Sequence, residues 1–247
     1  MGQLYVDTIE PQSGTSLTIG ESGQNTVLAG NDIRANVLQD AGGNAIFTSN
    51  GSGTISGVNS AFGSSQVLLN TTTLGSATAN VDFTTAISGA FTSTYWYYEW
   101  HFFNLEVSSQ PNTLQFLLSN DGSAWSPTKT GSFQRAQNNT GNNNIAWGYQ
   151  SSLSLSNSAN AMPIASDLGN DSGNEALCGI LRIWDVTSTT RQNAWISKTV
   201  YDHSGDYVQG TWTAGHTGGT GAIVAIRFQL ASNNINSGAV FKMYGFK

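Results

Sequence analysis

Apolar and polar residues alternate most regularly near the end of the chain. Ala222, Val224, Ile226, Phe228 and Leu230 share one phase of this pattern, and the intervening positions include Arg227 and Gln229. A period of two is typical of a β-strand with one face on a core, so both polar side chains are expected to face solvent or a partner. After a turn rich in Asn, Ser and Gly, a second apolar run from Val240 to Phe246 predicts a further sheet strand.

Similar strand-sized apolar segments recur from Gln66 onward, and no segment shows the 3.6-residue period of a helix. Turn signals such as Asn-Asp-Gly and Thr-Gly-Gly separate them. The pattern predicts an all-β fold: an antiparallel β-sandwich, jelly-roll-like, over residues 66–247. Besides the two closing runs, the expected strands are Val67–Leu69, Ala79–Phe83, Tyr95–Val107, Leu114–Leu118, Leu177–Val186, Ala194–Tyr201 and Tyr207–Trp212.

The segment Tyr95–Val107 is apolar in both phases, which predicts a central strand covered on both sides. One phase contains Trp96, Tyr98, Trp100 and Phe102, and the other contains Tyr95, Tyr97 and Phe103. By contrast, Phe133–Ser158 and Ala159–Asn174 are too polar to be core strands throughout. We expect loops or edge hairpins there, where a rigid scaffold commonly carries its binding function.

Residues 1–65 differ from the rest because their apolar islands are short and are divided by Gly-rich turns. No island is large enough to form a core, so the segment must pack on a neighbour or on copies of itself. An extended attachment or shaft segment is expected, with a flexible linker as the alternative. Burying these side chains between chains predicts a homotrimer ordered by residues 1–65.

Composition limits the possible partners. Charged residues make up only 10% of the chain, the net charge is −6, and nine Lys and Arg leave no basic patch for phosphates. No apolar stretch is long enough to span a membrane, and the first residues lack the pattern of a signal peptide, so synthesis in a cytoplasm is expected. The single Cys178 excludes an internal disulfide and predicts a small buried apolar residue.

Three phrases carry a resemblance to a known group of proteins: LYVDTIEPQSGTSLTIGESG, NVLQDAGGNAIFTSNGSGTISG and IRFQLASNNINSGAVFKMYGFK. They resemble the short structural and tail-fibre proteins of tailed bacteriophages, particularly marine and freshwater phages. The middle of the chain, from NTTTLGSATANVDF to the LSNDGSAW hairpin, is similar to the same group. The resemblance implies a virion component, commonly a homotrimer, with an N-terminal attachment segment and an outward-facing β-sandwich.

Catalysis and metal binding have weaker support in the sequence. Glycoside hydrolysis requires two carboxyl groups across the scissile bond, whereas most carboxylates of the sandwich fall at turns. Glu99 and His101 share a strand phase, and an intrasheet polar pair or interface contact is the favoured interpretation. The loop Asp167–Glu175 has the oxygen ligands of a calcium loop, but a tight surface loop has the same composition. We therefore expect no catalytic residue, metal or cofactor.

Binding is better supported, because three aromatic residues lie in or beside loop-like sequence. Trp125, Trp147 and Tyr149 would each present an apolar face and a polar edge to a sugar, and Asn143 with its neighbouring asparagines would supply amide groups. Each ring could instead fill the core beneath its own loop. The strand tryptophans are assigned to core or subunit contacts: Trp96, Trp100, Trp184, Trp195 and Trp212.

Together these observations predict a non-enzymatic structural protein of a phage virion, a trimeric fibre or fibre-like appendage. Residues 1–65 would contact other virion proteins, and residues 66–247 would form the sandwich, with host-receptor or glycan binding as an added role. A capsid decoration protein, a carbohydrate-binding module and a glycan depolymerase are the alternatives. No nucleic-acid partner and no membrane insertion are expected.

Overall fold

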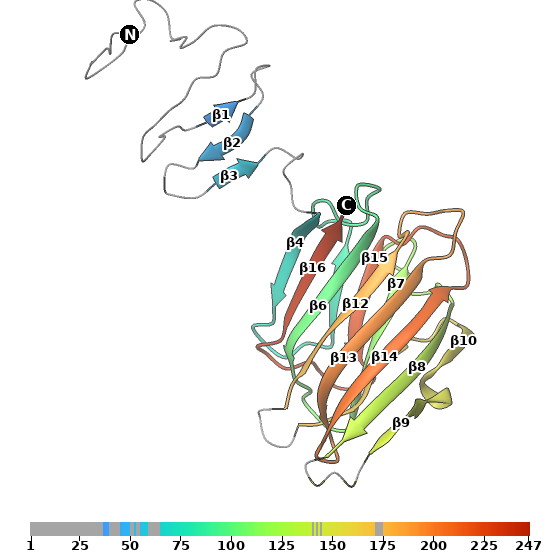
Figure 1. Ribbon diagram of the computed structural model, residues 1–247. Helices are drawn as coiled ribbons and strands as arrows, with labels where there is room; N and C mark the ends of the chain where they lie inside the picture. Colours follow the sequence, from blue (N-terminus) through green and yellow to red (C-terminus); the bar gives the residue numbers. More distant parts are fainter. Residues whose placement is uncertain are drawn as a thin grey trace, which may run out of the picture. The chain divides into compact units, whose positions relative to one another are not determined.

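The computed structural model describes residues 37–39, 45–49, 52, 55–58, 65–139, 141, 143, 145–170 and 175–247. The chain divides into two compact units, residues 1–63 and 64–247. Each unit has its own antiparallel sheet (Figure 1).

The first unit contains a three-stranded antiparallel sheet of β1 (Val37–Gln39), β2 (Ala45–Ser49) and β3 (Ile55–Val58), in that order. The last three apolar islands of this region are therefore strands, as their spacing predicted. In β1, Val37 is 42% exposed and Leu38 is 50% exposed, so this sheet presents apolar side chains to solvent. The expected shaft contacts of the earlier islands fall outside the described residues.

The second unit is all-β, as predicted, with one short 3-10 helix among its described residues. Its elements are β4 (Gln66–Thr73), β5 (Asn80–Thr84), β6 (Tyr97–Leu105), β7 (Asn112–Ser119), β8 (Lys129–Asn138), β9 (Ala146–Tyr149), η1 (Ser151–Leu153), β10 (Leu155–Ser158), β11 (Met162–Leu168), β12 (Leu177–Trp184), β13 (Ala194–His203), β14 (Tyr207–Thr217), β15 (Ala225–Leu230) and β16 (Val240–Phe246).

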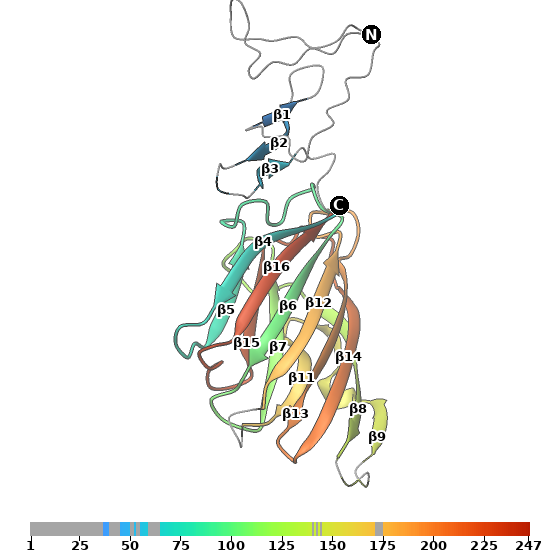
Figure 2. The same ribbon diagram turned by 60° about the vertical axis from the view of Figure 1, so that its left-hand side comes forward.

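The strands form one continuous antiparallel sheet that curls into two layers. The larger layer has the order β4-β16-β6-β12-β13-β14-β8, and β9 and β10 both pair with the free side of β8. The smaller layer has the order β11-β7-β15-β5. The layers join where Leu168 of β11 pairs with His203 of β13. Figures 1 and 2 show the strands of the larger layer side by side in this order.

Aromatic side chains from both layers fill the space between them. Trp100 of β6 meets Phe83 of β5 and Phe228 of β15 edge to face, with ring centroids 6.2 Å and 6.1 Å apart. At the other end of the core, Phe116 of β7 packs edge to face on Trp195 of β13 at 5.5 Å. Each ring is essentially inaccessible to solvent. Burial of a side chain of this size contributes about 1.5–3 kcal/mol, so these contacts hold the two layers together.

Two glycines make room for the Trp195 indole ring. Gly131 of β8 and Gly215 of β14 face each other in register. A Cβ atom on Gly131 would lie 2.9 Å from the Trp195 ring, and one on Gly215 would clash with that ring and with the Thr130 carbonyl oxygen. At this point the backbone of β8 and β14 therefore packs directly against the Trp195 ring.

The predicted strands are all present, but two segments expected to be loops or edge hairpins also contain full strands. β8 pairs along its length with β14, and five of the first six residues of β11 cannot be reached by solvent. The polar sequence of β8 is compatible with a central position because Lys129, Gly131 and Phe133 face inward while the polar residues between them face outward. The expectation of an edge hairpin agrees with the β8–β9 hairpin within Phe133–Ser158, whereas the expectation for Ala159–Asn174 is wrong because β11 is a buried strand.

β6 is central, between β16 and β12, yet it is covered on one side only. Tyr98, Trp100 and Phe102 face the core, whereas Tyr97 and Phe103 lie on the outer face of the larger layer. The expectation that both faces are covered is wrong for the described residues. An aromatic surface is left open on the side away from the core.

Candidate binding site

The outer face of the larger layer carries the candidate site. Outward positions are fixed by the strand registers, because directly paired residues of neighbouring strands lie on the same face. At the β9 end, Ala136 pairs with Trp147, and Gln134 pairs with both Tyr149 and Trp212. Trp212 in turn pairs with Lys198 of β13. One row across β9, β8, β14 and β13 therefore contains Tyr149, Gln134, Trp212 and Lys198, in this order.

These residues form a polar and aromatic surface, here called the aromatic platform: Trp147, Tyr149, Gln134, Trp212 and Lys198. Trp147 is 76% exposed, Tyr149 is 59% exposed and Trp212 is 42% exposed. Because neighbouring strands are about 4.8 Å apart, Tyr149 and Trp212 are separated by roughly 10 Å across the sheet. Trp147 lies two residues from Tyr149 in β9, so the platform also extends along the strand direction.

Gly210 allows the Trp212 ring to lie against the sheet. A Cβ atom on Gly210 would lie 3.3 Å from Cη2 and 3.6 Å from Cζ3 of that ring, so the indole covers the bare backbone of its own strand. The Trp212 side chain remains 42% exposed in this position. Beside it is a shallow hollow of about 200 Å³, lined by Ser132, Gln134, Ile196, Ser197, Lys198, Trp212, Thr213 and Ala214.

The polarity of β14 is inverted relative to an ordinary half-buried strand. Its inward positions include Gln209, Thr211 and Thr213, whereas Val208 and Trp212 face outward. Two of these inward residues form side-chain hydrogen bonds: Thr211 Oγ1 donates to the Ile164 carbonyl oxygen at 2.6 Å, and the Gln209 amide donates to the Tyr201 hydroxyl. The apolar phase of this strand is therefore available for contacts outside the domain.

Two of the predicted binding residues, Trp147 and Tyr149, lie together on the platform and are exposed. A third, Asn143, lies in the β8–β9 loop, where its side-chain oxygen accepts a hydrogen bond from the Asn139 amide at 2.6 Å. The Asn143 backbone N–H also donates to Asn139 Oδ1 at 3.0 Å. Asn143 thus helps to close the loop that precedes the platform.

Trp125 does not join this group. The Arg227 guanidinium lies over its ring, 4.5 Å from the centroid, and Arg227 faces outward from β15 in the smaller layer. Two hydrogen bonds from Arg227 to Asp82, at 2.7 Å and 2.6 Å, fix that guanidinium. Trp125 therefore lies on the opposite face of the sandwich from the platform. The outward position of Arg227 itself was predicted correctly.

The strand tryptophans were assigned to core or subunit contacts, and two of the five are core residues. Trp100 and Trp195 are buried, whereas Trp96 is 77% exposed and Trp184 is half-buried on the outer face. Trp212 belongs to the platform. Sequence reasoning missed Trp212, Gln134 and Lys198. A signal for Trp212 was present: Gln209, Thr211 and Thr213 form one polar phase of the strand, and Trp212 lies in the other phase.

A buried carboxylate lies farther along the same outer face. Glu99 accepts a hydrogen bond from Arg182 Nε at 2.7 Å and forms an ion pair with Arg182 Nη2 at 2.6 Å, and its other oxygen is 2.6 Å from His101 Nε2. The Arg182 guanidinium also lies 4.6 Å from the Tyr97 ring centroid. The expected intrasheet pair of Glu99 and His101 is confirmed. Glu99 is engaged by two neighbours, which leaves it poorly placed to act on a ligand.

His203 lies at the β13–β14 turn and contacts several polar groups. The Gly205 N–H donates to His203 Nδ1 at 2.9 Å, and His203 Nε2 lies 2.8 Å from the Tyr207 hydroxyl and 3.6 Å from Asp167. Burial lowers the pKa of His203, with the nearby Arg135 acting in the same direction and Asp167 opposing it. Because Nδ1 accepts a hydrogen bond, this site favours the neutral imidazole.

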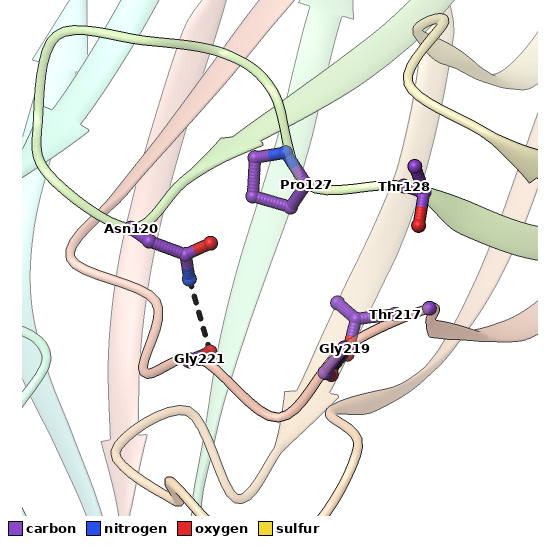
Figure 3. A pocket seen from close by; sticks show the side chains of 7 residues that line it. Asn120, Pro127, Thr128, Thr217, Gly219 and Gly221 are labelled. Carbon is purple, nitrogen blue, oxygen red and sulfur yellow. Dashed lines mark hydrogen bonds between the residues drawn. The ribbon is translucent and has the colours of Figure 1, made fainter.

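A second hollow of about 200 Å³ lies between the β7–β8 and β14–β15 connections (Figure 3). It is lined by Asn120, Pro127, Thr128, Thr217, Gly218, Gly219 and Gly221, none of which is titratable. Asn120 Nδ2 donates to the Gly221 carbonyl oxygen at 3.0 Å and ties the two connections together, as Figure 3 shows. The walls provide shape but no group for acid–base chemistry.

The described residues include no cluster of three or more His, Cys, Asp and Glu side chains placed to hold a metal ion. Residues 171–174 of the loop considered for calcium lie outside them. Within the same residues, no helix has the length and apolar character to cross a membrane. Cys178 lies in β12 and is half-buried, whereas a buried residue was expected.

Comparisons of the chain with known protein families, with curated proteins and with solved structures found no match.

Proposed function

We propose that this protein is a non-enzymatic structural component of a phage virion and that its sandwich binds a glycan of the host surface through the aromatic platform. One observation carries the binding role: Trp147, Tyr149 and Trp212 are exposed on one sheet face and are held in register by β9, β8 and β14. Flat rings with solvent-facing π-surfaces suit the apolar faces of pyranose rings.

The polar residues of the platform suit the same ligand. Gln134 lies between Tyr149 and Trp212 in the transverse row, and its amide can donate to and accept from sugar hydroxyl groups. The rings stand on strands of a large sheet, so little conformational entropy is lost when the ligand is bound. A rigid row of this kind suits an extended polymer chain better than a small enclosed ligand.

Binding without hydrolysis is favoured because none of the five residues that define the aromatic platform is a carboxylate. Glycoside hydrolysis places two carboxyl groups on either side of the scissile bond. Asp202 and Asp206 line a separate hollow at the β13–β14 turn, and Glu99 is engaged by Arg182 and His101. The proposed role is therefore recognition.

The virion role rests on the resemblance to phage structural proteins and on the first unit. Val37 and Leu38 are exposed apolar side chains in a small sheet, and copies of the chain or a neighbouring virion protein would cover them. We propose a homotrimer assembled through residues 1–65. Sedimentation of the full chain against residues 66–247 tests this point: a trimer that becomes a monomer on truncation supports it, and a monomeric full chain contradicts it.

The binding role is tested with the full chain on an array of bacterial surface polysaccharides. Trp147→Ala and Trp212→Ala should each weaken binding about tenfold, which corresponds to ~1.4 kcal/mol. Trp96→Ala is the matched control, because Trp96 is as exposed as Trp147 but lies away from the platform, and it should leave binding unchanged. Equal losses in all three variants, or losses in none, would contradict the proposed function.

A further inference from the structure

We infer that the glycan bound by the aromatic platform is an acidic polysaccharide, whose carboxylate or sulfate group pairs with Lys198. This inference rests on the proposed function and names its ligand class. The observation behind it is the position of Lys198, an exposed cation directly opposite Trp212 in the register of β13 and β14.

Lys198 differs from the other cations of the sheet. Lys129 is buried and Lys242 lies over the Phe103 ring, whereas three arginines form ion pairs. Arg182 pairs with Glu99, Arg227 pairs with Asp82, and Arg135 lies 3.9 Å from Asp167. In the described part of the chain, no acidic side chain forms an ion pair with Lys198. The outward-facing acid of the same strand, Asp202, is four residues away, about 13 Å along an extended strand. The ammonium group is therefore open to a ligand anion.

The geometry lets stacking and charge pairing act on the same sugar residue. Directly paired residues of antiparallel strands have Cβ atoms about 4.5–5.5 Å apart, so the lysine stem starts beside Trp212. A pyranose ring that stacks on the indole projects its carboxylate or sulfate sideways from its edge. The flexible lysine can reach that group, while Gln134 lies on the other side of the ring for the hydroxyl groups.

The shallow hollow beside Trp212 provides the place for such a residue. Lys198, Gln134 and Trp212 all line it, so a cation, an amide and an aromatic face converge on one space of about 200 Å³. A nucleic acid would also bring stacking groups and negative charge. A single lysine does not supply the several phosphate contacts on which such binding depends, so the acidic glycan is favoured.

The test uses the full chain and polymers that differ only in charge. Calorimetry at low salt compares alginate with carboxyl-reduced alginate and dextran sulfate with dextran. Wild-type protein should bind the acidic member of at least one pair about threefold to fivefold more tightly than the neutral one, the effect expected of an exposed ion pair. Added salt should remove this difference because it screens exposed charges.

Three variants locate the charge effect. Lys198→Gln should abolish the preference for the acidic polymer, whereas Lys198→Arg should keep it. Lys247→Gln removes the same charge from the end of the chain and should also keep it. Retained preference in Lys198→Gln, or an equal loss in Lys247→Gln, overturns the inference.

The remaining outcomes separate this inference from the proposed function. If wild-type protein binds the neutral and acidic polymers equally and Trp212→Ala loses both, the glycan-binding role stands and the acidic ligand is wrong. If wild-type protein binds neither member of either pair, both proposals fail. Tighter binding of single-stranded poly-dT than of any polysaccharide also overturns the inference.

Discussion

Replacing Lys129 should reveal how much a buried charge costs this fold. Lys129 begins β8 and is wholly inaccessible to solvent, and its Nζ donates one hydrogen bond, to the Pro127 carbonyl oxygen at 3.0 Å. Burial lowers the pKa of this lysine from 10.5 to about 8. Between these two pH values the unfolded chain binds more protons at this position than the folded chain. The free energy of unfolding should therefore rise with pH across that window.

The size of the effect follows from the two pKa values. At ~1.4 kcal/mol for each unit of difference, the lysine lowers the free energy of unfolding by about 3 kcal/mol near neutral pH. Most of this cost disappears by about pH 10, so the difference between wild type and Lys129→Met should change by about 2.5 kcal/mol between about pH 7 and about pH 10. Comparing the two proteins cancels the titration of every group that they share.

Urea unfolding at a series of pH values, followed by tryptophan fluorescence, measures this difference. Lys198→Met is the control, because it makes the same substitution at an exposed position of the same layer and should shift the free energy of unfolding by less than about 0.5 kcal/mol. A constant difference between wild type and Lys129→Met across the whole pH range would refute the reasoning. It would show that Lys129 is not a desolvated cation in the folded protein.

Three further changes test other parts of the structure. Gly215→Ala should lower the free energy of unfolding by about 1–3 kcal/mol, because the added Cβ would clash with the Trp195 ring and the Thr130 carbonyl oxygen. Gly148→Ala is the control, because a Cβ there has no atom within 4 Å, and it should leave the free energy of unfolding nearly unchanged in the same urea measurement. Equal effects of the two substitutions would contradict the packing argument. Gly210→Val should displace the Trp212 ring and weaken glycan binding with little change in melting temperature, whereas unchanged affinity in calorimetry would show that the ring position does not matter. Acidification below the usual histidine pKa of about 6.5 should lower the free energy of unfolding. The pKa of His203 is lowered in the folded protein, so the unfolded chain binds a proton there first. His203→Gln should reduce this pH dependence, and an unchanged dependence would assign it to other groups.

The sequence predicted the fold wherever the apolar residues alternate or run continuously. β15 and β16 are strands, and Arg227 and Gln229 face outward, because a strand with one buried face imposes a period of two. The same rule failed for β8, since one glycine and several polar residues fill most of its positions. Its inward glycine, Gly131, is required by the Trp195 ring from another strand, and no local pattern reveals such a requirement.

The candidate site was predictable only in part. Trp147 and Tyr149 were found because they lie in polar sequence, where an aromatic residue has no nearby core to join. Trp212 was assigned to core or subunit contacts because it lies in a strand, and only the three-dimensional structure shows that Thr211 and Gln209 take the inward positions. Trp125 looked equivalent to Trp147 along the sequence. The pairing of distant strands places the two on opposite faces.

The central claim, that the aromatic platform binds a glycan, is tested most directly by the indole N–H signals of the protein in a ¹⁵N-labelled spectrum. Each of the seven tryptophans gives one such signal, and single substitutions assign them. On titration with alginate oligosaccharides, the signals of Trp147 and Trp212 should move together and saturate, while those of Trp96 and Trp125 stay in place. Movement of Trp96 or Trp125 without Trp147 and Trp212 would contradict the claim.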